Sequence, residues 1–194
     1  MEAFEQFVAL AMEAEGLVVS GALKFDVKRR TRKLAYEEWQ THGYEVDLIG
    51  ARSDRLVLAT VKSFFGSRGV VADHVTGAGG YTSWYALLNE PDVRDTVVNT
   101  AAERFGFRPD QVEMRLYVGR FAGGANEVRV REWASQQVIG AGPLAVIGAE
   151  DVVATVRQVA ARKQYRDNAV LATMKVLAAT GALAPVVSTS GAVE

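Results

Sequence analysis

The stretch YEVDLIGARSDRLVLATVKSF, residues 44–64, contains two apolar segments that carry charged side chains in unexpected places. Residues 44–50 and 55–62 have the composition of strands, and the polar sequence ARSD between them is typical of a turn. We therefore expect two antiparallel strands. Charges are costly on buried strands, so the acids of the first strand and Lys62 of the second call for a specific reason.

Side chains alternate between the two faces of a strand. Glu45, Asp47 and Ile49 therefore share a face of the first strand, and Thr60 and Lys62 share a face of the second. In a normal hairpin, Asp47 lies across from the Thr60–Lys62 end. Carboxylate oxygens bind Mg²⁺ and an ammonium group stabilises developing negative charge, so this arrangement suits a divalent cation and a phosphate. A structural alternative is an edge lysine that discourages aggregation.

The segments YEVDLIG and LVLATVKSFFGS, preceded by an opening helix with a glutamate, resemble the core of the PD-(D/E)XK nuclease superfamily. The resemblance covers residues 2–70 and follows the resolvase-like and restriction-like members. It matches Asp47 with the motif aspartate, Lys62 with the motif lysine and Glu5 with the helix glutamate, with Glu2 as the alternative. It implies a restriction-endonuclease-like fold and hydrolysis of phosphodiester bonds in DNA with Mg²⁺ or Mn²⁺.

The sequence departs from the family pattern at Thr60, two residues before Lys62, where the family has Glu, Asp or Gln. A threonine hydroxyl is a neutral ligand and cannot replace a carboxylate's charge. In one interpretation Glu45 supplies the missing acid, so that Asp47, Glu5 and Glu45 hold the metal. In another, the site has lost its metal affinity and the fold binds nucleic acid or a protein partner without cutting. In a third interpretation the resemblance is accidental, and the protein is a small-molecule enzyme or an interaction domain.

A basic run, KFDVKRRTRK at residues 24–33, stands out in a chain whose formal net charge is −1. A solvated loop or strand edge accounts for it as well as a phosphate-facing patch does. In the second case the DNA-binding residues are expected to be Lys28, Arg29, Arg30, Arg32 and Lys33, together with Arg68 beyond Lys62. DNA is the expected partner, no membrane contact is expected, and a homodimer stays open.

Several classes of protein are disfavoured by composition. The chain has no cysteine, which excludes disulfides, thiolate zinc sites and cysteine nucleophiles. Its two histidines, His42 and His74, lack neighbours at zinc-ligand spacing, and no nucleophile elbow is present. The acidic start does not resemble a signal peptide, and no apolar run reaches the roughly 20 residues of a membrane span. We expect a cytoplasmic protein.

The remaining pattern predicts an α/β fold with a mixed central sheet flanked by helices and a C-terminal helical segment. Domain boundaries are expected at 1–150 for the core, 151–183 for the C-terminal helices and 184–194 for a flexible tail. The expected further elements are a helix before Gly16, a strand within 17–27, a helix at 91–105, strands at 112–121, 126–133 and 142–148, and helices at 149–165 and 166–181, the last with Asp167 as its N-cap.

The glycine-rich sequence TGAGGYTS, residues 76–83, lacks the lysine of a phosphate-binding P-loop and is interpreted as a mobile connection before a short helix. At helical spacing, Tyr81, Trp84 and Leu88 predict a core stripe, which we favour over base stacking. The cations of the closing helices are assigned to a solvated helix end rather than to a DNA-binding face. They are Arg157, Arg162, Lys163 and Arg166.

Overall fold

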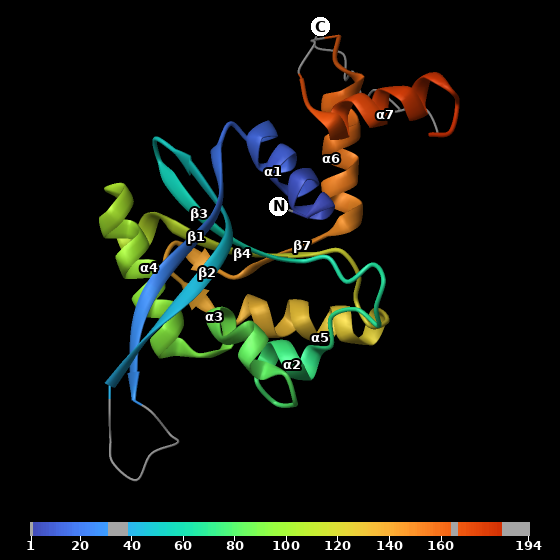
Figure 1. The fold of residues 1–194 in the computed structure, drawn as a ribbon. Coiled ribbons are helices and arrows are strands. Elements are labelled where there is room, and N and C mark those ends of the chain that lie inside the picture. The colour runs from blue at the N-terminus through green and yellow to red at the C-terminus, as the bar shows by residue number, and fades with distance from the viewer. Residues whose placement is uncertain (1, 31–38, 164–166, 184–194) are drawn as a thin grey trace, which may run out of the picture.

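The computed structural model describes residues 2–30, 39–163 and 167–183 (Figure 1). The helices in these ranges are α1 (Ala3–Ala14), α2 (Ala72–Thr76), the 3₁₀ turn η1 (Thr82–Tyr85), α3 (Ala86–Asn89), α4 (Pro91–Phe105), the 3₁₀ turn η2 (Pro109–Gln111), α5 (Gly124–Ser135), α6 (Ala149–Ala161) and α7 (Ala169–Ala179). The strands are β1 (Val18–Arg30), β2 (Trp39–Arg52), β3 (Arg55–Lys62), β4 (Val112–Val118), β5 (Val138–Ile139), β6 (Gly142–Pro143) and β7 (Ala145–Gly148).

The main sheet has the strand order β1-β2-β3-β4-β7. The β1–β2 and β2–β3 pairs are antiparallel, whereas the β3–β4 and β4–β7 pairs are parallel. Helices α1 and α6 cover one face, and α2 to α5 cover the other (Figure 1). The predicted α/β class, with a mixed central sheet and a C-terminal helical segment, is confirmed.

The alternation of side chains along β3 supplies both faces with apolar groups. Val57, Ala59 and Val61 join the cluster beneath α1, whereas Leu56 and Leu58 join the larger cluster on the face of α3, α4 and α5. This is why β3 is a continuous apolar run, as expected for a central strand that is covered on both sides. The run therefore places the end of β3, at Lys62, between two helical layers.

The predicted strand at 126–133 is wrong, because these residues lie in α5. The alternation of Val128 and Val130 with charged residues imitates a strand. In the structure Val130 and Ala134 are the buried positions of the helix, and Val128 is 54% exposed. Parallel strands need a long crossover, and α5 supplies it between β4 and β7.

Two smaller predictions are also corrected. The N-cap of α7 is Asn168 rather than Asp167, because the Asn168 side chain accepts hydrogen bonds from the backbone N–H groups of Val170 and Leu171 at 3.0 and 3.1 Å. The segment 71–90 contains α2 before its glycines, in addition to η1 and α3 after them.

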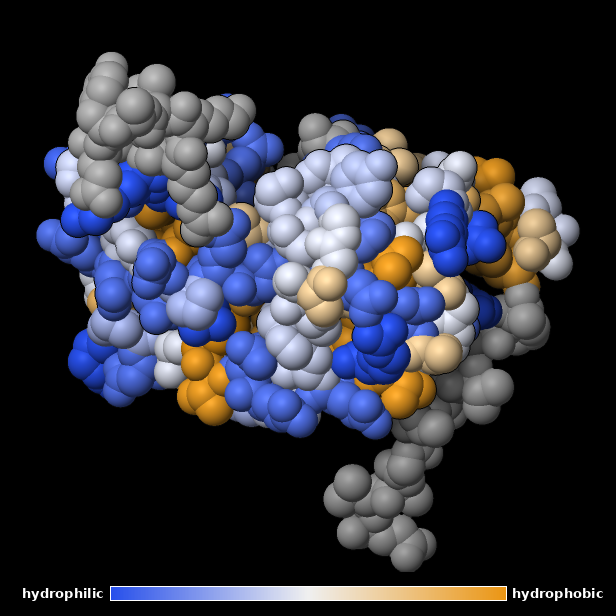
Figure 2. Space-filling view, turned by 90° about the horizontal axis from the view of Figure 1, so that it is seen from below, coloured by the Kyte–Doolittle hydropathy of each residue, from blue (hydrophilic) through white to orange (hydrophobic). Residues whose placement is uncertain are grey.

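Within the described ranges, no helix is both long and apolar enough to cross a membrane. Arg32, Lys33 and Arg166 lie outside the described residues, as does the predicted tail at 184–194. The face viewed in Figure 2 is largely hydrophilic, with separate hydrophobic patches.

Candidate functional site

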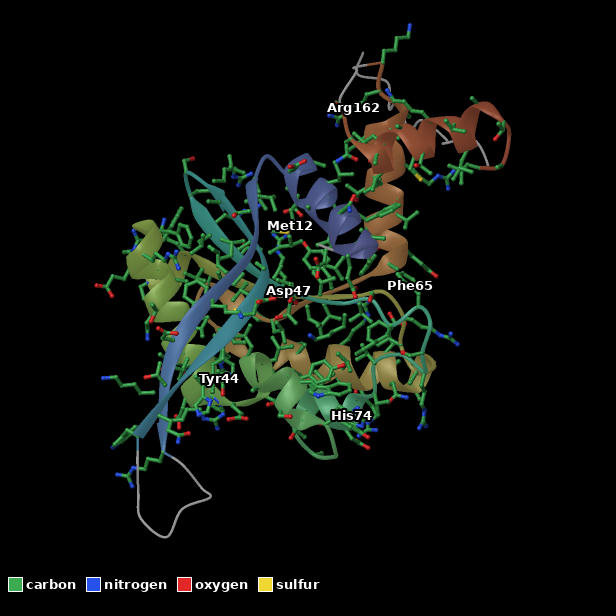
Figure 3. All side chains as sticks on the ribbon, viewed as in Figure 1. Met12, Tyr44, Asp47, Phe65, His74 and Arg162 are labelled. Carbon is green, nitrogen blue, oxygen red and sulfur yellow. The ribbon has the colours of Figure 1, made fainter. Side chains whose placement is uncertain are left out.

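The site begins where β2 separates from β3. The two strands pair from Leu48 to Arg52 of β2, whereas β2 continues to pair with β1 beyond that point. Asp47 directly precedes Leu48 in β2, so it is the first residue beyond the paired part. Its Oδ2 accepts a hydrogen bond from the backbone N–H of Val61 at 2.6 Å. The carboxylate therefore satisfies a main-chain donor at the place where the strand ladder stops. Figure 3 shows Asp47 between α1 and the layer of α2 and α3.

Asp47 and Lys62 line one cavity of about 190 Å³. One wall comes from β2 and β3 and includes Glu45 and Thr60, and the opposite wall comes from η1 and α3. The lining residues are Gly43, Tyr44, Glu45, Asp47, Thr60, Lys62, Ser83, Trp84, Tyr85, Ala86, Leu87 and Leu88. The fold thus brings together two residues that sequence reasoning paired, and adds a wall that it did not predict.

The electrostatic environment of Asp47 links the remaining candidate acids to the cavity. Burial raises the pKa of Asp47 above its ordinary value, and the charges of Glu5 and Glu45 act in the same direction. The Val61 N–H and the Lys62 ammonium oppose this rise without cancelling it. Glu5, Glu45 and Lys62 therefore all lie within electrostatic range of one half-buried aspartate.

Glu5 reaches this region because α1 begins beside the end of β3. Its Oε2 accepts a hydrogen bond from the backbone N–H of Glu2 at 2.9 Å, as one half of a capping box. Oε2 of Glu2 accepts a hydrogen bond from the Ser63 hydroxyl at 2.8 Å, directly after Lys62. The two glutamates proposed from the sequence therefore also hold the helix start, and Glu2 ties it to β3.

Lys62 is positioned by an aromatic residue that sequence reasoning missed. Its Nζ lies 5.8 Å from the centroid of the Tyr85 ring, a cation–π arrangement. Tyr85 is 1% exposed, and burial raises the pKa of its hydroxyl to about 12, so the ring stays neutral. No local pattern marks Tyr85, because its contact with Lys62 joins segments more than twenty residues apart.

Thr60 and Glu45 differ sharply in their surroundings. Thr60 is 4% exposed, and its Oγ1 has no hydrogen-bond partner in the described part of the chain. Glu45 is exposed and pairs with Lys24 at 3.8 Å. The buried hydroxyl is consequently an uncommitted oxygen in the cavity wall, whereas Glu45 can turn toward solvent.

The described residues contain no group of three or more His, Asp or Glu side chains that could hold a metal ion. Asp47, Glu5 and Glu45 thus do not form a ready-made cage. Their oxygen chemistry still matches Mg²⁺, which proteins often bind through one or two carboxylates plus substrate phosphate and water.

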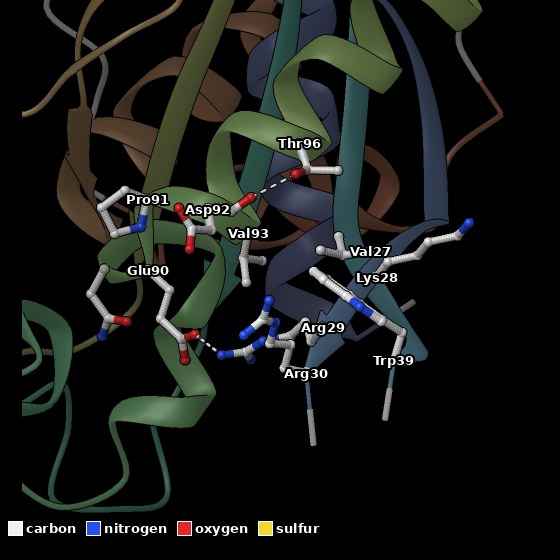
Figure 4. Close-up of a pocket in the computed structure, with 11 residues that line it drawn as sticks. Val27, Lys28, Arg29, Arg30, Trp39, Glu90, Pro91, Asp92, Val93 and Thr96 are labelled. Carbon is white, nitrogen blue, oxygen red and sulfur yellow. Dashed lines mark hydrogen bonds and ion pairs between the residues drawn. The ribbon is translucent and has the colours of Figure 1, made fainter. Parts of the chain in front are cut away.

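Residues 24–30 of the basic run lie on β1, and Lys28, Arg29 and Arg30 line a larger hollow of about 750 Å³ (Figure 4). Lys28 and Arg30 are exposed, and the Arg30 guanidinium stacks on Trp39 at 5.3 Å from the ring centroid. Arg29 is partly buried and is fixed by the fold, because it donates hydrogen bonds to the Tyr44 hydroxyl at 2.5 Å and to Glu90. Lys28, exposed beside this hollow, is therefore placed to contact a phosphate.

Arg68 is exposed in the loop after β3. The predicted core stripe is wrong for two of its three members. Leu88 is buried, but Tyr81 and Trp84 are 63% and 58% exposed. The helical spacing assumed for them fails because Tyr81 lies in the turn before η1 and has a left-handed backbone.

No family model, curated protein or solved structure matches this chain.

Proposed function

We propose that the protein is a metal-dependent nuclease that hydrolyses phosphodiester bonds in DNA. The observation that carries this proposal is the single cavity lined by Asp47 and Lys62 at the point where β2 leaves β3. A carboxylate and an ammonium on the same wall of one small cavity suit a cation and a phosphate at once. The likeness to the PD-(D/E)XK superfamily, DNA as the partner, a cytoplasmic location and a possible homodimer belong to this proposal.

Each residue has a distinct role in the proposed site. Asp47, with Glu5 or Glu45, would bind Mg²⁺ or Mn²⁺, and the buried Thr60 hydroxyl offers a neutral oxygen. A bound metal ion supplies an activated water and neutralises charge on the phosphate. Lys62, held against Tyr85, would stabilise the negative charge that develops during attack. Lys28 and Arg30 would attract the DNA backbone.

A second function is favoured by Thr60 itself. The neutral residue stands where the family has an acid, and the described residues offer no preformed set of three metal ligands. These observations support a module that binds nucleic acid or a protein partner without hydrolysis. The two functions differ in one measurable outcome, which is strand cleavage.

The test is a cleavage assay on plasmid, linear duplex and single-stranded DNA with Mg²⁺ or Mn²⁺. We expect metal-dependent cleavage that falls at least about 100-fold in Asp47→Ala and in Lys62→Ala. The matched controls are Asp110→Ala, an exposed acid paired with Arg108, and Lys175→Ala on α7, which should cleave like the natural protein.

Salt-sensitive DNA binding without cleavage in either metal would establish the second function. Cleavage that survives in both Asp47→Ala and Lys62→Ala would show that the reaction occurs elsewhere.

A further inference from the structure

Two aromatic rings lie exposed beside the proposed cleavage cavity. Tyr81 and Trp84 are 63% and 58% exposed, and their ring centroids are 4.8 Å apart at an interplanar angle of 44°. His74 also contacts Tyr81, in an edge-type arrangement with ring centroids 5.3 Å apart. Trp84 is also part of the cavity wall that faces Asp47 and Lys62. The rings therefore form a surface that is continuous with the cavity.

The backbone holds these rings outward. Tyr81 has φ of 58°, a left-handed conformation that is uncommon for a residue with a side chain. The Asn89 side chain donates hydrogen bonds to the carbonyl groups of His74, Val75 and Thr82 at 3.1–3.2 Å, which joins α2 to η1. Tyr81 thus has a strained backbone in a segment that the Asn89 hydrogen bonds hold in place. This combination points to a functional use of the exposed rings.

The geometry points to unpaired bases of a DNA strand as the occupant of this surface, so that the proposed nuclease acts on single-stranded DNA. Bases present flat apolar faces at regular spacing along a chain of phosphates, and exposed aromatic rings stack on them without regard to sequence. In a duplex these faces are already stacked inside the helix, which leaves only a single strand able to use the rings. With its phosphate beside Lys62, such a strand places the neighbouring base against Trp84.

This inference rests on the proposed function for the position of the phosphate, but its test is binding without metal. The measurement is fluorescence anisotropy of a labelled oligothymidylate of about 20 nucleotides and of a duplex of equal length, in EDTA and at one salt concentration. We expect the single strand to bind at least about tenfold more tightly than the duplex. Trp84→Ala and Tyr81→Ala should each weaken single-strand binding by roughly 10- to 100-fold and change duplex binding little.

Trp84→Phe, which keeps a flat ring, should retain most of the affinity, and circular dichroism checks that each variant is folded. The matched control is Phe105→Ala, since Phe105 is also an exposed ring, 37% exposed at the end of α4, and lies outside the cavity wall. It should bind like the natural protein. An oligouridylate arm tests RNA as the ligand, and binding of this RNA without binding of either oligothymidylate or oligodeoxyuridylate would overturn the assignment to DNA.

Equal losses for single strand and duplex, or no loss in either alanine variant, would overturn the inference. So would the absence of binding to both nucleic acids. Cleavage that requires Asp47 and Lys62 but not Trp84 and Tyr81 would leave the nuclease proposal intact and remove only the stacking surface. Single-strand binding that requires the two rings, without any cleavage, would leave the stacking surface intact and remove only the nuclease proposal.

Discussion

At the scale of single residues, Asp47 meets two opposing demands. Its carboxylate must be ionised to bind a cation, yet the partly buried site disfavours the charge and raises the pKa. Its hydrogen bond from Val61 restores part of the lost stability. Residues that are costly to the fold and retain a charge in a cavity are candidates for function rather than for structure.

The pH dependence of stability tests this conflict through Asp47→Asn. The pKa of Asp47 is higher in the folded than in the unfolded chain, where it is near 3.8. Its contribution to stability is therefore fully present below pH 3.8 and is lost as the pH rises through the folded-state pKa. At pH 7 we expect Asp47→Asn to be more stable than the natural protein in urea unfolding, and the difference should vanish in acid.

Asp47→Ala is the control for the hydrogen bond. Asparagine can still accept from the Val61 N–H, whereas alanine leaves this donor unpaired, so the alanine variant should be about 1 kcal/mol less stable than the asparagine variant. Equal stability of the natural protein and Asp47→Asn from acid to neutral pH would contradict the prediction.

That Glu45, Asp47 and Lys62 lie on neighbouring strands could be predicted at this scale, because the two apolar segments and the turn between them are local signals. Tyr85 could not, because a buried tyrosine in a short helix carries no local sign of the lysine it contacts.

At the scale of elements, apolar composition bounded by turn residues was sufficient to predict β2 and β3, whereas the two-residue alternation in residues 126–133 gave the wrong element for α5. In residues 126–133, alternating valines satisfy a strand pattern, while the i, i+4 pair Val130 and Ala134 satisfies a helix. The sheet decides that these residues form a helix, because β4 and β7 are adjacent and parallel and therefore require a long crossover between them.

An ion-pair network joins the end of α1 to the strands, at their ends away from the cavity. The guanidinium of Arg115, 8% exposed, donates hydrogen bonds to Glu15 at 2.8 Å and to Glu113 at 2.8 Å. Arg55 pairs with the same two glutamates. This network positions α1, and therefore Glu5, over the sheet.

Acid sensitivity of the network is tested by Glu113→Gln. Burial by itself raises the pKa of Glu113, but hydrogen bonds and charge from Arg115 and Arg55 outweigh it and lower the pKa below 4.5. The stabilisation is thus present above pH 4.5 and is lost as the pH falls through the folded-state pKa. We expect Glu113→Gln to lower the free energy of unfolding by about 1–2 kcal/mol at pH 7, and by less near pH 3.

Glu103→Gln, at an exposed position of α4, is the matched control and should stay within about 0.5 kcal/mol of the natural protein. A Glu113→Gln variant that unfolds like the natural protein at pH 7 would show that the network is not stabilising.

At the scale of the whole molecule, the net charge is close to zero, and positive charge is concentrated in one stretch of the chain. The net charge of −1 cannot attract DNA by itself, so attraction depends on local groups of exposed cations, such as Lys28 and Arg30 on β1 and Arg68 in the loop after β3. Arg29, in the same basic run as Lys28, instead joins β1 to Glu90 at the start of α4.

This division predicts different effects within one basic run. Lys28→Ala should weaken DNA binding alike for all sequences and reduce the slope of log affinity against log salt by about one. Arg29→Ala should mainly lower thermal stability, because it removes the contacts with Tyr44 and Glu90. The measurement is a salt titration of binding, with Lys175→Ala as control. An unchanged slope in Lys28→Ala would remove β1 from the DNA-binding surface.

The sequence by itself determined the hairpin of β2 and β3, the placement of Asp47 and Lys62 on it, and the class of fold, because these follow from the apolar composition and turn residues of short segments. Only the tertiary structure decided that β2 leaves β3 at Asp47, that Glu5 lies within electrostatic range of it, and that Tyr85 and Trp84 close the cavity. Such contacts join segments far apart in the chain. They depend on how helices pack against both faces of the sheet, which no local pattern of side chains encodes.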